Sequence, residues 1–123
     1  MNFTYPKTEK LKSKKTIESL FTEGKSVAQF PLRIVYVPLE NETENKVGAS
    51  VSKKYFKKAV DRNYYKRVLR ECYRLNKTLL FEGLNKKYAV MLFYQTRERL
   101  SYQEVNAKIL LLFEKFNSAE KTY

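Results

Sequence analysis

A single basic segment, residues 51–77, constrains this chain more than any other feature of its sequence. It reads VSKKYFKKAVDRNYYKRVLRECYRLNK and holds ten Lys or Arg residues against two acids, a net +8 out of the chain's +12. At about 100° per residue, this segment separates into two helical faces. The cationic face spans about 140° and consists of Arg62, Asn63, Lys66, Arg67, Arg70 and Arg74. The opposite face holds Tyr65, Val68, Leu69, Cys72 and Leu75.

One face of this helix can therefore pack on a core while the other presents a fixed array of cations. Like charges four residues apart, such as Arg62, Lys66 and Arg70, repel one another in an isolated helix. A partner of opposite charge would relieve that repulsion, and a regular polyanion suits the array best. The pattern predicts nucleic-acid binding.

The composition places this charge on a folded body. At 123 residues the chain is long enough for one core, so residues 1–123 are predicted to form a single domain. Hydrophobic residues make up 43% and aromatics 15%, too much for a disordered basic tail. Neither an apolar run near 18 residues nor a signal-peptide pattern occurs, so the expected location is the cytoplasm, away from membranes.

The lack of histidine limits which catalytic and metal-binding sites the chain can form. The sequence contains no His, which removes the commonest general base near neutral pH and the commonest metal ligand. No catalytic residue is predicted, because no acid and base of suitable pKa pair up among the Tyr, Glu and Lys residues. Glu40, Glu42 and Glu44 alternate in a polar loop, which is a poor metal cage, so no metal site is predicted. Cys72 is expected to be a buried structural thiol.

The N-terminal part predicts a lead-in and one helix. Residues 1–10 are expected to be an extended or flexible segment, because Pro6 opposes helix there. A short helix is predicted from Ser13, which can cap it, to Gly24, which can end it. Its apolar stripe consists of Ile17, Leu20 and Phe21.

Strand patterns come next. LRIVYVPLE follows Pro31 and alternates, and KVGASVS follows the polar connection at residues 40–45. We expect these two runs to pair as an antiparallel hairpin. Residues 25–30 are expected to add a short strand before them.

The second half predicts a helix, a strand and a helix. The basic helix is expected from about 58 to 80, followed by a turn at Gly83 and an apolar strand over residues 88–94. Ser101 and Glu104 form a capping-box pattern that opens the final helix. The order α-β-β-β-α-β-α predicts an α+β fold, a sheet with helices packed against it.

Several candidate residues keep two interpretations. Asn63 can cap the basic helix, or it can donate to a phosphate or contact a 2′-hydroxyl. Lys53 and Lys54 follow a strand, where alternation sends only one of them into a groove; both can equally be solvated. Among the aromatics, Phe21, Tyr36, Tyr55 and Tyr94 can stack on single-stranded bases or pack in the core.

Three motifs carry a family resemblance. VSKK at 51–54, KAVDRN at 58–63 and KRVLRE at 66–71 resemble the protein subunit of bacterial ribonuclease P. Upstream, Leu11, Ile17, Phe21 and the run Gly24-Lys25-Ser26 agree with the same family, so the resemblance covers nearly the whole chain. Two positions depart from the pattern. Tyr64 stands where the family's motif has an arginine, and Ile17 stands where it often has phenylalanine.

The resemblance implies a particular fold. It is a single-domain α-β-β-β-α-β-α sandwich with a mixed four-stranded sheet, similar to the second domain of a small-subunit ribosomal protein. The β-α-β crossover around the basic helix is left-handed, against the strong right-handed default.

The resemblance also implies a function and two sites. The chain would be the accessory protein subunit of an endoribonuclease whose catalytic RNA uses RNA-bound Mg²⁺ to remove the 5′ leader from precursor tRNA. The isolated protein would need no cofactor. The residues implied to bind the catalytic RNA are Arg62, Asn63, Lys66, Arg67, Arg70 and Arg74. The residues expected in a cleft for the single-stranded leader are Ile17, Phe21, Ser52, Lys53 and Lys54, with Tyr36 as a further aromatic candidate.

Two alternatives remain beside this hypothesis. A ribosomal protein or an RNA chaperone without a cleavage role would share the charge and size. A self-sufficient ribonuclease would cleave RNA by itself. The implied partners are the catalytic RNA and precursor tRNA, with no DNA and no membrane.

Overall fold

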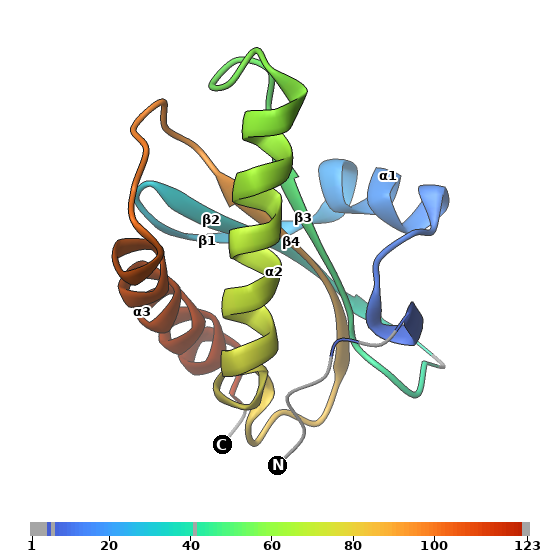
Figure 1. Cartoon of the computed structure of the whole chain (residues 1–123). Helices are drawn as coiled ribbons and strands as arrows, with labels where there is room; N and C mark the ends of the chain where they lie inside the picture. The colour runs from blue at the N-terminus through green and yellow to red at the C-terminus, as the bar shows by residue number, and fades with distance from the viewer. Residues whose placement is uncertain (1–4, 6, 41, 122–123) are drawn as a thin grey trace.

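Three α-helices and one four-stranded sheet make up the computed structural model, which describes residues 5, 7–40 and 42–121 (Figure 1). The predicted order α-β-β-β-α-β-α is confirmed. A 3₁₀ turn at Lys7–Glu9 precedes these elements, which are α1 (Lys14–Glu23), β1 (Lys25–Gln29), β2 (Leu32–Leu39), β3 (Lys46–Val51), α2 (Ala59–Phe81), β4 (Lys87–Tyr94) and α3 (Tyr102–Glu120).

The strands lie in the order β1-β2-β4-β3, so the predicted hairpin of β2 with β3 is wrong. β2 pairs antiparallel with β1 on one side and with β4 on the other, whereas β3 pairs with β4 in parallel. The physical reason lies in β4, whose sequence is almost entirely apolar and whose residues 88–92 are all buried. Such a strand is most stable in the centre of a sheet, where it displaces the local pairing of its neighbours.

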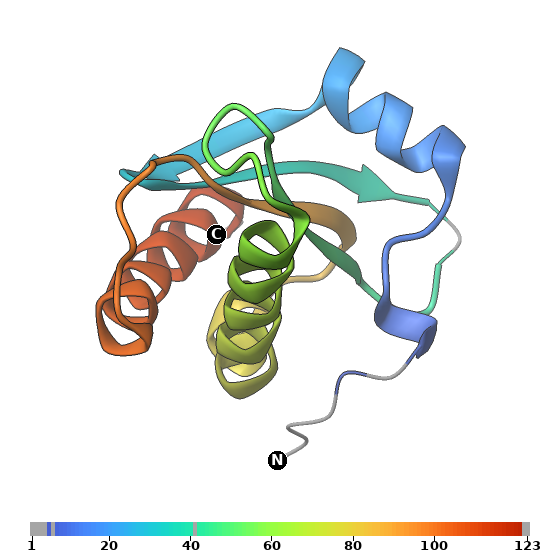
Figure 2. The same ribbon diagram turned by 45° about the horizontal axis from the view of Figure 1, so that its top comes forward.

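β3, α2 and β4 form a β-α-β unit with a left-handed crossover. In Figure 1, α2 lies in front of the sheet and β4 lies to the left of β3. Helices α2 and α3 cover one face of the sheet, and α1 lies against the other face (Figure 2). The left-handed connection is uncommon, because strand twist favours the right-handed form.

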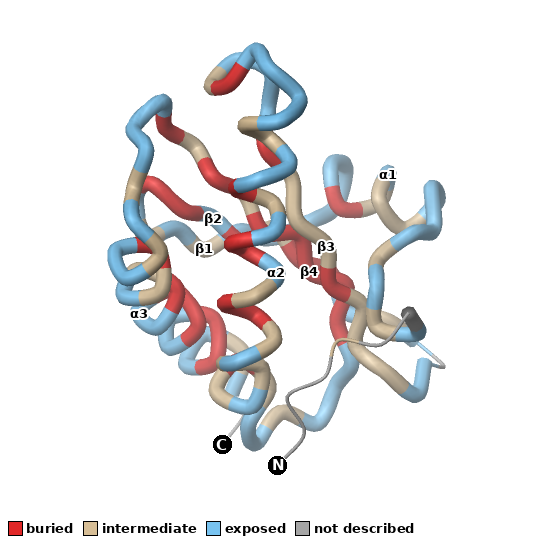
Figure 3. Tube along the Cα trace, viewed as in Figure 1, coloured by how far each residue is buried: buried red, intermediate tan, exposed pale blue. Residues whose placement is uncertain are grey.

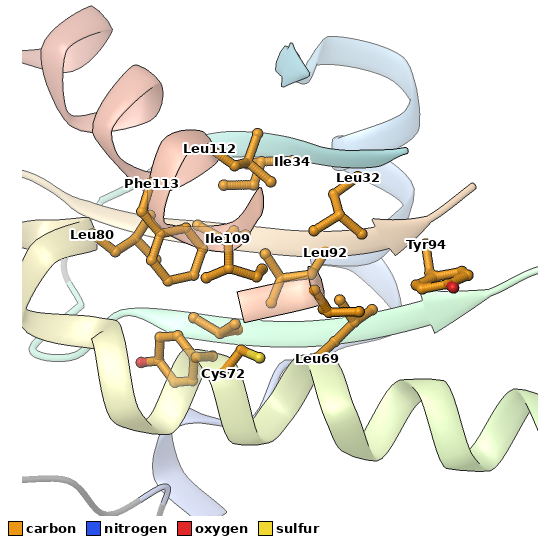
Figure 4. Close-up of a cluster of buried hydrophobic side chains, with 14 of the residues drawn as sticks. Leu32, Ile34, Leu69, Cys72, Leu80, Leu92, Tyr94, Ile109, Leu112 and Phe113 are labelled. Carbon is orange, nitrogen blue, oxygen red and sulfur yellow. The ribbon is translucent and has the colours of Figure 1, made fainter. Parts of the chain in front are cut away.

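The main core lies between the sheet and the pair α2 and α3 (Figure 4). β2 contributes Leu32, Ile34 and Tyr36 to it, α2 contributes Leu69 and Cys72 among others, and all of these are buried. The opposite side of α2 is exposed over most of its length (Figure 3). The predicted apolar face is confirmed except at Leu75, which is 40% exposed, while Tyr73 is buried.

A smaller core lies under α1. Leu20 packs there with Val37, Ala89 and Met91 on the other face of the sheet. Gly24 ends α1 where the chain passes close to β2. A Cβ at Gly24 would lie 2.2 Å from the Leu20 carbonyl oxygen and 2.7 Å from Val35 Cγ1. Only glycine therefore allows α1 to sit this close to the sheet.

The predicted helix starts at Ser13 and Ser101 are confirmed. Ser13 accepts a hydrogen bond from the Thr16 amide, and Ser101 and Glu104 form a complete capping box. The turn at Gly83 has a positive φ of 75°, as a glycine turn allows.

The N-terminal segment is more structured than predicted. Lys7–Glu9 form the 3₁₀ turn, and the next residues run parallel to the edge of β3, where the Leu11 amide donates to the Val47 carbonyl. Glu9 accepts hydrogen bonds from Tyr73 and Lys77 of α2. The expectation of an extended chain is therefore wrong for residues 7–9, while residues 1–4 and 6 lie outside the described residues.

Candidate nucleic-acid interface

The exposed side of α2 presents the predicted cations along one face. Asn63, Arg67 and Arg70 are exposed, and Lys66 is half-buried. No acid pairs with Lys66, Arg67 or Arg70 within the described part of the chain. These three charges are therefore available to an external anion.

Arg62 has a different position from the others. Its guanidinium donates to the carbonyls of Phe56 and Lys57, at 2.9 and 2.7 Å. The first residue before the helix, Lys58, makes no side-chain capping bond. Arg62 therefore ties the start of α2 to the preceding loop, so part of its hydrogen-bonding capacity serves the fold.

Arg74 is also engaged inside the protein. Its guanidinium donates to both carboxylate oxygens of Glu71, at 2.5 and 3.0 Å. This bidentate contact lowers the pKa of the Glu71 carboxyl. Arg74 lies on the predicted face, but its charge is offset by a neighbour on the same helix.

Asn63 does not cap α2, because the helix begins at Ala59 and has Lys58 at its cap position. Its exposed amide instead lies between the cations of the first two turns. This leaves the interpretation in which Asn63 contacts a partner.

A second surface lies on the face of the sheet that α1 covers in part. Arg33 of β2, Phe93 of β4 and Ser50 of β3 are neighbours in one row across the strands. Arg33 is exposed, and Phe93 and Ser50 are half-buried. Phe21 of α1 is 67% exposed and contacts the Phe93 ring edge-on at 6.3 Å between centroids. The row thus joins an aromatic pair to a cation and a hydroxyl.

Of the two apolar residues predicted for the cleft, Ile17 is half-buried against the small core under α1 and Phe21 is exposed. Tyr36 is wrongly assigned to the cleft. It is 3% exposed, faces α3 on the other side of the sheet, and donates a 2.8 Å hydrogen bond to Glu120. The reason is register: even-numbered residues 32, 34 and 36 of β2 all point into the main core.

Ser52, Lys53 and Lys54 are exposed on a turn that leaves β3. Strand alternation no longer applies there, because the Tyr55 and Phe56 amides both donate to the Ser52 carbonyl. The Lys54 ammonium lies 5.6 Å from the centre of the Tyr55 ring. Both lysines can therefore face the same partner.

A cavity of about 380 Å³ lies between the N-terminal segment, α1, β3 and α2. Its lining residues are Tyr5, Lys10, Leu11, Lys12, Ile17, Val47, Gly48, Ala49, Arg70 and Met91. Arg70 of the cationic helix face and Ile17 of the cleft thus share one cavity. The two sites that the sequence separates meet at this point.

The exposed fractions of two further tyrosines, Tyr94 and Tyr64, show which of them can contact a partner. Tyr94 is 1% exposed, so it packs in the core, whereas Tyr64 is 46% exposed. Tyr64 contacts the buried Tyr65 ring edge-on at 4.9 Å. Tyr64 is thus neither buried nor cationic, and it presents an aromatic surface where the family's motif has an arginine.

The sequence pattern did not indicate Arg33, Phe93 or Arg97, which lie beside the candidate site residues. For Arg33, the alternation of β2 indicates the outward position, because its neighbours Leu32 and Ile34 point into the main core. Arg97 lies beside Lys54 although 43 residues separate them in sequence, and no local pattern indicates such a contact.

In residues 5, 7–40 and 42–121, no three Cys, Asp or Glu side chains gather as they would around a metal ion. None of the helices in this part of the chain is long and apolar enough to cross a bilayer.

Comparison with known proteins adds independent findings. The model of the ribonuclease P family matches residues 5–117. The ribonuclease P protein component of Porphyromonas gingivalis is 39% identical over 105 residues, which cover 80% of this chain and 74% of that protein. The ribonuclease P protein component of Dictyoglomus thermophilum is 31% identical over 113 residues, 92% of each chain.

Solved structures of the same kind share the fold. The RNase P protein of Staphylococcus aureus superposes with a TM-score of 0.73 at 18% identity, over 87% of this chain and 94% of that one. The RNase P protein of Thermotoga maritima gives a TM-score of 0.71 at 25% identity, over 87% and 96%.

Proposed function

The chain belongs to the family of ribonuclease P protein components, and from that premise we propose that it binds a catalytic RNA and the single-stranded 5′ leader of precursor tRNA. In this proposal the RNA subunit, with its own Mg²⁺, hydrolyses the phosphodiester bond. The protein supplies binding and charge, and it acts in the cytoplasm.

One observation carries the proposal: two cationic surfaces of different character meet at Arg70. The helix face with Arg67 presents mainly cations, with the exposed ring of Tyr64 at its border, and suits the phosphates of a folded RNA. The sheet face with Phe21 and Phe93 combines rings with cations. Single-stranded RNA is bound by such a combination, because every base can stack and every phosphate is negative.

The physical effect is to reduce repulsion between two RNAs. A cation placed between their phosphates lowers the electrostatic cost of bringing them together. It also releases counterions, so each contact should change the slope of log affinity against log salt by about 0.7 to 0.9. Because stacking and backbone contacts do not read base edges, leader binding should depend little on leader sequence.

Reconstitution tests the proposal. The purified chain is added to the cognate ribonuclease P RNA at low Mg²⁺, and leader removal from precursor tRNA is measured. We expect faster cleavage with the protein than without it, and no cleavage by the protein alone. RNA binding without any gain in cleavage would instead support a ribosomal protein or an RNA chaperone. Cleavage by the protein alone would support a self-sufficient ribonuclease.

A further inference from the structure

The carboxyl ends of β3 and β4 lie side by side. The two strands are parallel, and Val51 is paired with Tyr94 at the last position of each. The segments that follow, residues 52–54 and 95–97, therefore leave the sheet at the same edge, which is the upper edge in Figure 1. Loops that follow neighbouring parallel strands commonly form binding sites for this reason.

The loop between β4 and α3 has a defined shape. The Tyr94 hydroxyl donates to the Glu98 carbonyl and accepts from the Leu100 amide, at 2.5 and 3.0 Å. The Glu98 amide donates to the Thr96 hydroxyl at 3.2 Å. The loop backbone is thus folded around the hydroxyl of one buried tyrosine, Tyr94.

Arg99 attaches this loop to the start of α2. Its guanidinium donates to both oxygens of Asp61, at 3.2 and 3.1 Å, and lies 5.3 Å from the centre of the Phe56 ring. The charge of Arg99 is therefore offset within the protein, and its role is to hold the loop in place.

Arg97 is left as the outward charge of the loop. Its side chain is exposed, and its Nε and one terminal nitrogen lie 3.4 Å from the Lys54 carbonyl oxygen. No acid pairs with Arg97 in the part of the chain that the structure describes. A guanidinium has five N–H donors in a planar fork, so donors remain for a phosphate.

We propose that Arg97 binds a phosphate of the single-stranded leader together with Lys53 and Lys54, which extends the cleft beyond the end of the sheet. This inference rests on the proposed function. Three exposed cations lie on two neighbouring loops here, and Arg97 is oriented by the Lys54 backbone carbonyl. The partner is a nucleic-acid backbone, because the exposed residues beside Arg97 in this loop, Glu98 and Arg99, are charged and offer no ring or apolar group to select a base.

The leader is favoured over the catalytic RNA by position. Phe93 and Ser50 face the α1 side of the sheet, and Ser52 and Gln95 each follow them by two residues. A strand of RNA that stacks on Phe21 and Phe93 would therefore reach Ser52 and then Arg97 by continuing in one direction. The cations of α2 that serve a folded RNA lie on a different element.

Binding of precursor tRNAs with leaders of increasing length to the holoenzyme tests this inference. We expect Arg97→Ala to weaken binding several-fold, with a salt slope lower by about 0.7, only for leaders long enough to reach the loop. Affinity for mature tRNA and for the catalytic RNA should not change. Arg97→Lys keeps the charge and should retain the salt slope.

The matched control is Lys86→Ala, which removes one exposed charge just before β4, at the opposite end of that strand. It should leave leader binding unchanged. Equal losses with mature and leader-bearing tRNA, a loss confined to the catalytic RNA, or no change with Arg97→Ala would each overturn the inference. If the wild-type protein confers no leader-dependent affinity, the proposed function itself fails.

Discussion

Phe21 is about two-thirds exposed, while the adjacent Leu20 is buried under α1. A large exposed aromatic side chain contributes little to folding, because the apolar area it removes from water is small. Its ring meets Phe93 edge-on, and most of the Phe21 side chain stays accessible to a stacking partner. At the scale of single residues, Phe21 is thus free to serve the binding role that we propose, whereas Tyr36 is a core residue.

Phe21→Ala should weaken binding of leader-bearing precursor tRNA by about 1–3 kcal/mol, the usual value of one stacked base. Its melting temperature should stay close to that of the wild type. Binding to the holoenzyme and thermal unfolding give the two measurements. Equal losses for mature tRNA would argue against leader contact, and a large loss of stability would mean that Phe21 is a core residue.

Tyr36→Phe should show the opposite pattern. The change removes the hydroxyl that donates to the Glu120 carboxylate but keeps the ring in the core. The free energy of unfolding should fall by about 1–3 kcal/mol, because the charged acceptor loses a buried donor. Urea unfolding measures this, and leader affinity should be unchanged. Tyr88→Phe is the natural companion, since Tyr88 donates to the other oxygen of Glu120.

Cys72 should resist alkylation in the folded protein. Burial raises the pKa of its thiol from 9.0 to about 11, so almost no thiolate is present at neutral pH. Since the folded state favours the protonated thiol, the free energy of unfolding is unaffected below pH 9. Above that it falls by up to about 1.4 kcal/mol per pH unit until about pH 11.

Iodoacetamide labelling with and without urea checks the accessibility of this thiol, and urea unfolding between pH 7 and 11 checks the slope. Cys72→Ala should be less stable at neutral pH but should lose less stability in alkali. Rapid labelling of the folded chain would contradict the burial of Cys72.

At the scale of elements, α2 divides its cations between two tasks. Arg62 and Arg74 are bonded to groups of the protein, to carbonyls before the helix and to Glu71 respectively. Arg67 and Arg70 point outward. A helical wheel cannot distinguish these pairs, because all four residues lie in the same sector and only the neighbouring loop and side chains differ.

Arg67→Ala should therefore lower affinity for the catalytic RNA and reduce its salt slope by about 0.7 to 0.9, with unfolding unchanged. Arg62→Ala should instead lower the free energy of unfolding by about 1–3 kcal/mol, since two carbonyls lose a charged donor. Filter binding at several salt concentrations, with urea unfolding of both variants, makes the comparison. Equal effects of the two variants on stability would show that the outer face is structural as well.

The elements themselves follow from local sequence, while their pairing does not. Ser13, Ser101 and Glu104 mark helix starts because a cap involves residues three apart. The place of β4 depends on contacts with strands about 40 and 55 residues away, which no local pattern contains. The candidate site residues likewise include some that a local pattern predicts and some that only strand pairing brings into place. Arg67 could be predicted from helical period, whereas Arg97 depends on the parallel pairing of two strands.

At the scale of the whole molecule, the helix face and the cleft that we propose as RNA-binding surfaces adjoin each other. The cavity that contains both Arg70 and Ile17 lies between the N-terminal segment, α1, β3 and α2. Two RNAs bound to the two surfaces would meet there. Arg70 then has phosphates of both partners within reach.

Arg70→Ala should accordingly weaken binding of both the catalytic RNA and the leader-bearing precursor, whereas Arg67→Ala should affect only the former. A double-mutant cycle that combines Arg70→Ala with removal of the leader measures the coupling. Independent effects would indicate that Arg70 contacts a single RNA, and the two surfaces would then be separate.

The central position of β4 also has a consequence for how the protein is made. β2 and β3 are joined only through β4, so they cannot enter one sheet until residues 87–94 have been synthesised. The basic helix α2 precedes β4 in the chain and is therefore made before the sheet can form. On the ribosome, the helix would leave the exit tunnel with its cations and its apolar side both exposed, close to ribosomal RNA. Formation of the sheet then depends on contacts of long sequence separation, which form slowly. Synthesis of the last third of the chain thus converts an indiscriminate polycation into a folded protein with a defined face.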